Sequence, residues 1–236
     1  MKMHLKWLFV FLGFISFQTM AQVKNDISGA WHSKQGGQED VILFQDGYVT
    51  QTVYHTNEFL YSRGGTYKIA DNQMVVLVEY NSENNDEVGT QLKLNFDLKD
   101  NQLRLVMNDE SMVWSRLDKS NAPLAGVWQI TDRMEEGNVV PIQRTGTRKT
   151  LKVLTGTRFH WFAIDPATKL FAGTGGGTYT FKDGKYTENI EFFSRDNTRV
   201  GAALEFDGKL ENGKWHHSGL SSKGDKIYEV WGRTPY

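Results

Sequence analysis

Residues 64–67 (GGTY) recur unchanged as residues 176–179, 112 positions further along the chain. The same offset continues without a gap and aligns Glu79 with Glu191 and Leu92 with Leu204. A constant offset over such a length is the signature of an internal repeat. The sequence therefore predicts two homologous halves.

Two further matches mark the ends of the repeat. Residues 29–31 (GAW) return as residues 126–128 (GVW), and residues 113–116 (VWSR) return as residues 230–233 (VWGR). Between the halves lies a short polar stretch that ends in Pro123, and proline interrupts a continuing strand. We expect one domain over residues 22–121 and a second over residues 122–236.

Each half has the pattern of consecutive β-hairpins. Asp183-Gly184 and Asn212-Gly213 are turn-forming dipeptides, and the runs between them alternate apolar and polar residues, as in residues 204–210. The chain has 23 Gly, 4 Pro and 13% aromatic residues, which also favours a turn-rich β protein. Because hairpins must protect their edges, we predict an all-β fold of two tandem antiparallel up-and-down barrels.

The G-x-W and W-x-R motifs of both halves resemble the calycin pattern of lipocalins and fatty-acid-binding proteins. In that pattern a first-strand Trp closes one barrel end and a last-strand Arg packs across it. The resemblance implies that Trp31 meets Arg116 and that Trp128 meets Arg233. An Arg stacked on an indole gains about 0.5–2 kcal/mol.

The second half is also similar, over residues 157–232, to an uncharacterised lipocalin-like domain family of secreted bacterial proteins. The residues that carry this likeness are residues 158–161 (RFHW), the glycine-rich residues 173–179 and residues 215–219 (WHHSG). The likeness supports a lipocalin-like fold. It brings no established activity to this chain.

The first 21 residues have the features of a signal peptide. Lys2 and Lys6 precede an apolar run at residues 7–17, which is too short to span a bilayer, and small residues lead up to Ala21. We expect cleavage near Ala21 and a periplasmic or secreted protein that does not span the membrane. The absence of Cys excludes disulfides and thiolate metal sites, and the net charge of −1 offers no footprint for nucleic acid.

Comparison of the halves predicts a ligand pocket in the second barrel. At the 112-residue offset Glu188 replaces Val76 and His217 replaces Leu105, so polar groups occur where the first half is apolar. Aromatic walls with a few convergent polar groups are typical of small-molecule sites. The candidate lining residues are Arg158, Trp161, Tyr179, Glu188, Glu191, Arg195, His216 and His217. Strand parity lets only one of Glu188 and Glu191, and one of His216 and His217, face the interior.

Charge differs between the halves as well. Residues 22–121 hold 9 basic and 15 acidic residues, whereas residues 122–236 hold 16 basic and 13 acidic residues. Opposite net charges favour contact between the two barrels. A buried acid needs a partner, and Arg148, Arg158 and Arg195 are the candidates.

Three functions remain open. The favoured one is binding of an unidentified small molecule by the second barrel, with no cofactor and no metal. The second is an enzyme in which Glu188 or Glu191 acts as general acid or base with His216 or His217. The third is an interaction protein without a pocket, such as an inhibitor. A polar-lined cavity in the second barrel would distinguish the first two from the third.

Overall fold

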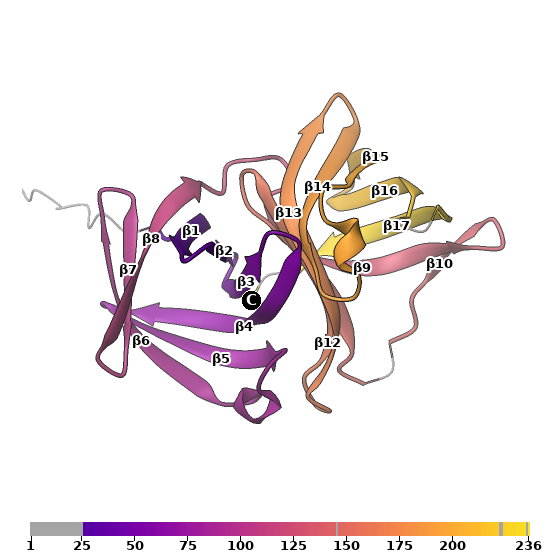
Figure 1. Cartoon of the computed structure of the whole chain (residues 1–236). Helices are drawn as coiled ribbons and strands as arrows, with labels where there is room; N and C mark the ends of the chain where they lie inside the picture. The colour runs from indigo at the N-terminus through magenta and orange to yellow at the C-terminus, as the bar shows by residue number, and fades with distance from the viewer. Residues whose placement is uncertain (1–25, 145, 222–223, 235) are drawn as a thin grey trace, which may run out of the picture.

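The structure, a computed structural model, describes residues 26–144, 146–221, 224–234 and 236. The predicted signal peptide, residues 1–21, lies outside the described residues. The described residues form an all-β protein of two antiparallel up-and-down barrels that lie side by side (Figure 1). The predicted fold class is confirmed.

The first barrel is a closed sheet of eight strands in sequential order, in which β1 pairs with β8. Its strands are β1 (Gly29–Gln35), β2 (Gln38–Gln45), β3 (Tyr48–His55), β4 (Glu58–Ala70), β5 (Gln73–Asn81), β6 (Gln91–Lys99), β7 (Gln102–Met107) and β8 (Glu110–Asp118). A 3₁₀ turn, η1 (Asn85–Glu87), follows β5.

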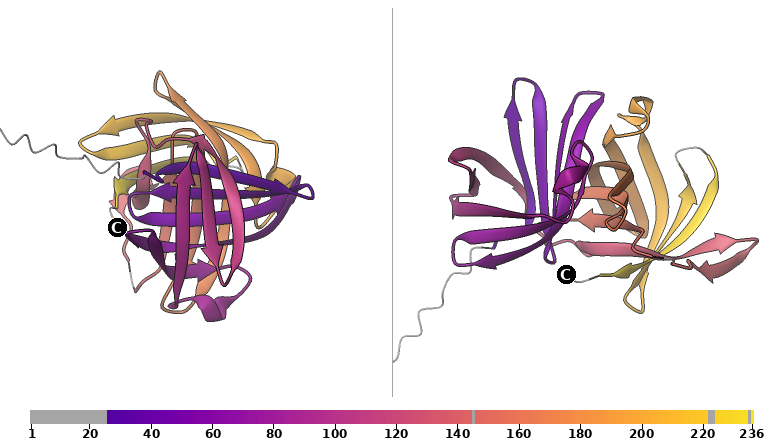
Figure 2. Two further views of the ribbon diagram at one scale, coloured as in Figure 1. Left: turned by 90° about the vertical axis from the view of Figure 1, so that its left-hand side faces the viewer. Right: turned by 90° about the horizontal axis from the view of Figure 1, so that it is seen from below.

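The second barrel repeats this order and closes where β17 pairs with β9. Its strands are β9 (Gly126–Glu135), β11 (Lys149–Leu154), β12 (Arg158–Asp165), β13 (Leu170–Lys182), β14 (Lys185–Phe193), β15 (Ala203–Glu211), β16 (Lys214–Leu220) and β17 (Lys226–Arg233). The short strand β10 (Asn138–Pro141) pairs only with β9, and their hairpin extends away from the barrel (Figure 2). The turn η2 (Asn197–Arg199) follows β14, as η1 follows β5. Among the described residues, no helix has the length and apolar character of a membrane span.

A Trp–Arg pair closes each barrel, as the resemblance implied. The Arg116 guanidinium lies 4.0 Å from the Trp31 ring centre, and that of Arg233 lies 4.4 Å from the Trp128 ring centre. Each indole N–H donates to a backbone carbonyl four residues earlier, at 2.8 Å in both barrels. Each arginine also donates to two carbonyls of the segment that enters its barrel. The pair thus ties the last strand to the start of the first.

The two barrels share an apolar core that is separate from their interiors. Tyr48 and Tyr80 of the first barrel stack on Phe162 of the second, with ring centres 5.6 and 4.8 Å apart. The other buried members of this inter-barrel core are Ala30, Val41, Leu43, Tyr54, Val127, Leu151, Val153, Ile164 and Phe192. Most come from the outward faces of β1–β3 and β9–β12. The barrels therefore pack with equivalent faces together.

Matching bulges shape this interface. The register between β4 and β5 slips between Gly64 and Gly65, and the register between β13 and β14 slips between Gly176 and Gly177. The glycines make room for the rings that cross them, because a Cβ added to Gly176 would lie 2.4 Å from the Phe192 ring. The first glycine of each pair is thus explained by packing between the barrels, whereas a Cβ on Gly177 would lie 2.0 Å from the Asn189 carbonyl oxygen of the neighbouring strand.

The bulges correct one expectation from strand alternation. Uninterrupted alternation along β14 would put Phe192 on the same face as Glu188 and Phe193 on the opposite face. Instead, Phe192 joins the inter-barrel core and Phe193 packs with the interior of the second barrel. The one-residue slip at Glu191 reverses the facing of the residues that follow it.

A carboxylate also fastens the two barrels. Asp118, at the end of β8, accepts hydrogen bonds from the backbone N–H groups of Gly156 and Thr157, at 3.1 and 2.8 Å. It also accepts from the hydroxyls of Thr155 and Thr157 and from Ala30 of its own barrel. One side chain therefore ties the end of the first barrel to the β11–β12 turn.

We predict that Trp128→Ala destabilises the protein by about 3–5 kcal/mol, because it empties a fully buried site and removes the partner of Arg233. Urea unfolding followed by circular dichroism measures the loss. Trp31→Ala is the matched variant in the first barrel. A loss below about 1 kcal/mol for Trp128→Ala would contradict a closing role.

A second prediction concerns His160, which is buried between the barrels with Nε2 2.7 Å from Thr174 Oγ1. Burial lowers the pKa of His160 from 6.5 to about 3. His160 therefore binds a proton more readily in the unfolded chain than in the folded protein. Its contribution to the free energy of unfolding is fully present above pH 6.5 and is lost as the pH falls towards 3. Wild type should lose about 2 kcal/mol more than His160→Gln between about pH 7 and about pH 5. Equal losses in chemical unfolding would show that His160 does not titrate on unfolding.

Candidate functional site

The interior of the second barrel contains a cavity of about 240 Å³. Apolar side chains from four strands form most of its wall, and a polar cluster of Lys152, Glu188, His217 and Glu229 lines one part of it. The other lining residues are Thr150, Trp161, Ile190, Phe193, Leu204, Phe206, Ser221, Ile227 and Trp231. Several of the apolar lining residues, such as Trp161 and Leu204, are only half-buried, so the cavity lies close to solvent.

A buried ion pair is the centre of the polar cluster. Lys152 Nζ, on β11, lies 2.7 Å from Glu188 Oε1, on β14, and both side chains are 6% exposed. Tyr186 donates its hydroxyl to the same carboxylate oxygen at 2.9 Å. Burial and the neighbouring Glu188 raise the pKa of Tyr186 well above its ordinary value, so the hydroxyl stays protonated.

Aromatic rings surround the Lys152 ammonium. Its Nζ lies between 5.2 and 5.8 Å from the ring centres of Phe159, Tyr186, Trp215 and Trp231. Cations are attracted to ring faces at such distances, most strongly where water is excluded. The rings and Glu188 together compensate the ammonium for its lost hydration.

His217 and Glu229 form the second polar pair. Nδ1 of His217 lies 3.4 Å from Glu229 Oε2, and His217 is 2% exposed. Burial lowers the pKa of His217, an effect that Glu229 only partly offsets. Burial opposes ionisation of Glu229, but His217 and Lys152 outweigh it and lower the pKa of Glu229. A neutral imidazole therefore faces an ionised carboxylate at neutral pH.

The structure brings together three of the predicted site residues: Trp161, Glu188 and His217 line one cavity. It also resolves the two choices that parity left open. Glu188 faces inwards and Glu191 faces the other barrel, where Tyr54 donates to it at 2.7 Å. His217 faces inwards, and His216 lies outside, with Nδ1 2.9 Å from the Tyr228 hydroxyl.

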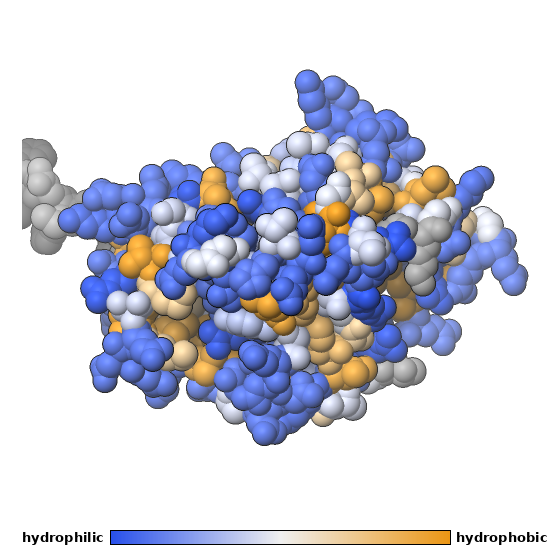
Figure 3. Space-filling view, in the orientation of Figure 1, coloured by the Kyte–Doolittle hydropathy of each residue, from blue (hydrophilic) through white to orange (hydrophobic). Residues whose placement is uncertain are grey.

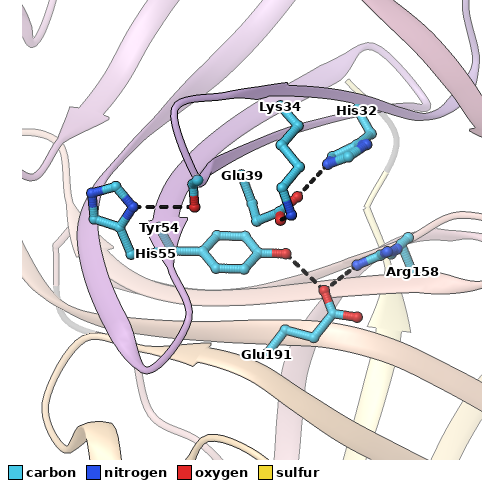
Figure 4. A network of polar contacts seen from close by, with 8 residues as sticks. His32, Lys34, Glu39, Tyr54, His55, Arg158 and Glu191 are labelled. Carbon is cyan, nitrogen blue, oxygen red and sulfur yellow. Dashed lines mark hydrogen bonds and ion pairs between the residues drawn. The ribbon is translucent and has the colours of Figure 1, made fainter.

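Glu191 and Arg158 belong to a polar network at the interface (Figure 4). Arg158 forms an ion pair with Glu191, so this carboxylate joins side chains of both barrels. Beside it, Glu39 pairs with His32 and Lys34 of the first barrel. Two charges that the sequence assigned to the pocket thus help to hold the barrels together.

The remaining two predicted residues lie away from the cavity wall. Tyr179 is buried in the interior and donates its hydroxyl to the Thr155 carbonyl at 2.7 Å. Arg195 lies at the surface, where its Nε donates to the Ala172 carbonyl at 2.7 Å. Both make structural contacts to backbone within the described chain.

Sequence reasoning missed Lys152, Glu229 and Phe193. The expectation that an arginine neutralises Glu188 is wrong, since Lys152 does so. Lys152 stands alone within the apolar run of residues 151–154 (LKVL), and that isolation was the available signal. Glu229 likewise stands alone within the apolar residues 227–231 (IYEVW), so the same signal was available for it.

The first barrel also has a cavity, which the comparison of the halves did not predict. Its volume is about 160 Å³. The wall is mainly aliphatic, with contributions from Met74, Val76, Leu92 and Leu105, and Arg63 is its one cation. Within the described residues no group of three His, Cys, Asp or Glu is placed to hold a metal ion. The face drawn in Figure 3 is mostly polar, with separate apolar patches over both barrels.

We predict that Lys152→Met costs about 3–5 kcal/mol of stability, because it leaves the Glu188 carboxylate buried without its counterion. The double variant Lys152→Met/Glu188→Gln removes both charges and should recover most of the loss. Urea unfolding of both variants provides the comparison. Equal losses in the single and double variants would mean that the ion pair contributes only packing.

Comparison with known proteins adds a family to the second barrel and no activity. A search of curated proteins found no match. Among solved structures, the Helicobacter pylori beta clamp bound to a DNA ligase peptide is 7% identical, with a TM-score of 0.15, over 90% of this chain and 58% of the clamp chain. The same clamp in complex with carprofen is 6% identical, with a TM-score of 0.15, over 86% of this chain and 54% of that one.

The chain thus spans little more than half the length of these clamp chains. The family match is confined to the second barrel. Residues 123–236 match the model of DUF4488, a domain of unknown function.

Proposed function

We propose that the second barrel binds a small molecule in its interior cavity. The observation that carries this proposal is the polar cluster inside an apolar cavity of about 240 Å³. Small-molecule sites combine apolar walls with a few polar groups that orient the ligand. A barrel that served only as a scaffold would gain stability from filling this space with apolar side chains.

The comparison between barrels supports the assignment to the second barrel. At the positions of Glu188 and His217 the first barrel has Val76 and Leu105, both of which line its own apolar cavity. The duplicated barrel therefore shows what this interior looks like without the polar cluster. Since residues 1–21 have signal-peptide features, we place the binding activity in the periplasm or outside the cell.

Native mass spectrometry of the protein purified from its source tests the proposal. We expect a small-molecule adduct that dissociates on gentle denaturation. Leu204 lines the cavity and is half-buried, so Leu204→Trp should narrow the cavity and remove the adduct. Leu92→Trp makes the equivalent change in the first barrel and should leave the adduct in place.

The two variants also separate the barrels as binding sites. An adduct that survives Leu204→Trp and disappears in Leu92→Trp would move the activity to the first barrel. Absence of any adduct, together with failure of a metabolite extract to restore one, would contradict small-molecule binding and favour the interaction protein.

A further inference from the structure

Two groups in the cavity of the second barrel have unused hydrogen-bonding capacity. His217 is 2% exposed, and neither of its ring nitrogens makes a well-formed hydrogen bond with the described residues. Lys152 carries three N–H donors, and Glu188 Oε1 is its one acceptor within the described chain. Buried polar groups without partners are costly, so a bound molecule that supplies those partners gains affinity.

The two groups stand over the same aromatic rings. The Trp215 ring centre lies 5.3 Å from Lys152 Nζ and 5.2 Å from the centre of the His217 ring. The Tyr186 ring centre lies 5.4 Å from the same Nζ and 5.6 Å from the His217 ring centre. Lys152 and His217 therefore share two ring neighbours in the interior of the second barrel.

The chemistry of the neighbours decides the polarity of a ligand group that contacts both side chains. A carboxylate only accepts, so Glu229 at 3.4 Å favours the tautomer with the proton on Nδ1 of His217. Nε2 of the neutral ring is then an acceptor, whereas the Lys152 ammonium can only donate. A ligand oxygen that accepts from Lys152 and also donates to His217 belongs to a hydroxyl group.

The charges of the site favour a neutral ligand. Glu188 and Glu229 outnumber Lys152, which opposes an anion, and the buried ammonium opposes a cation. The apolar wall includes Trp161 and Phe193, whose rings meet edge to face with centres 5.5 Å apart. Flat apolar molecules pack well against such rings.

We propose that the second barrel binds a neutral hydroxyl compound of the phenol class, whose oxygen accepts from Lys152 Nζ and donates to His217 Nε2. The ring of the ligand packs in the apolar part of the cavity, between Trp161 and the aliphatic side chains of Ile190 and Ile227. This assignment rests on the proposed function and adds the ligand class to it.

The test compares p-cresol with p-xylene, which replaces the hydroxyl by a methyl group of similar size, in calorimetric titrations of the whole protein. We expect p-cresol to bind about tenfold more tightly. In His217→Phe the preference should fall to about twofold or less. Leu105→Phe, at the equivalent position of the first barrel, should retain it.

Two further measurements keep the test independent of the folding of one variant. Lys152→Met/Glu188→Gln, which removes both charges together, should also reduce the preference for p-cresol. In the wild-type protein, p-cresol should shift the ¹⁵N resonance of His217 Nε2 and p-xylene should leave it unchanged, because only the phenol donates a hydrogen bond.

Equal affinities for the two probes would overturn the hydroxyl assignment and leave small-molecule binding intact. Tighter binding of 4-methylbenzoate or 4-methylbenzylamine than of p-cresol would overturn the neutral class. A preference that persists in His217→Phe, or binding of neither probe, would also reject the proposal. The adduct in native mass spectrometry reports separately on the proposed function.

Discussion

The arrangement of both barrels depends on a one-residue bulge opposite a glycine pair. In β14 the bulge at Glu191 reverses the alternation, so that Phe192 points to the other barrel and Phe193 points inwards. In β5 the equivalent slip lies at Glu79 and brings Tyr80 into the same inter-barrel core. One local device therefore supplies rings to the interface and, in the second barrel, a wall to the cavity.

Strand alternation separates two glutamates that lie before and at this bulge. Glu188 lies before it and pairs inside the barrel with Lys152, whereas Glu191 lies at it and bonds to Tyr54 of the other barrel. Glu79, the counterpart of Glu191, likewise accepts a hydrogen bond from the other barrel. Lys149 Nζ donates it to Glu79 Oε1 at 2.8 Å. The interface carboxylates are thus a property of the repeat, while the buried ion pair belongs to the second barrel alone.

A protein without cysteine must obtain its stability from packing and buried hydrogen bonds. The shared core adds a third apolar cluster to those inside the barrels, and Asp118 fastens the end of one barrel to a turn of the other. This support lets both interiors remain partly empty. An apolar cavity lowers the free energy of unfolding by about 24 cal/mol per Å³. Other contacts in the fold have to offset this loss of stability.

The sequence by itself determined the duplication and the all-β barrel fold, because these follow from a fixed offset and local alternation, and the resemblance of its G-x-W and W-x-R motifs implied the Trp–Arg closures. It also predicted Trp161, Glu188 and His217 as pocket residues, and all three line the cavity of the second barrel. Only the tertiary structure decided that Lys152 and Glu229 complete the cluster and that Arg158 and Glu191 leave it. The physical reason is that alternation decides only which residues of one strand share a face, whereas the residues that meet inside a barrel or across the interface come from strands far apart in the sequence, and no local pattern encodes those contacts.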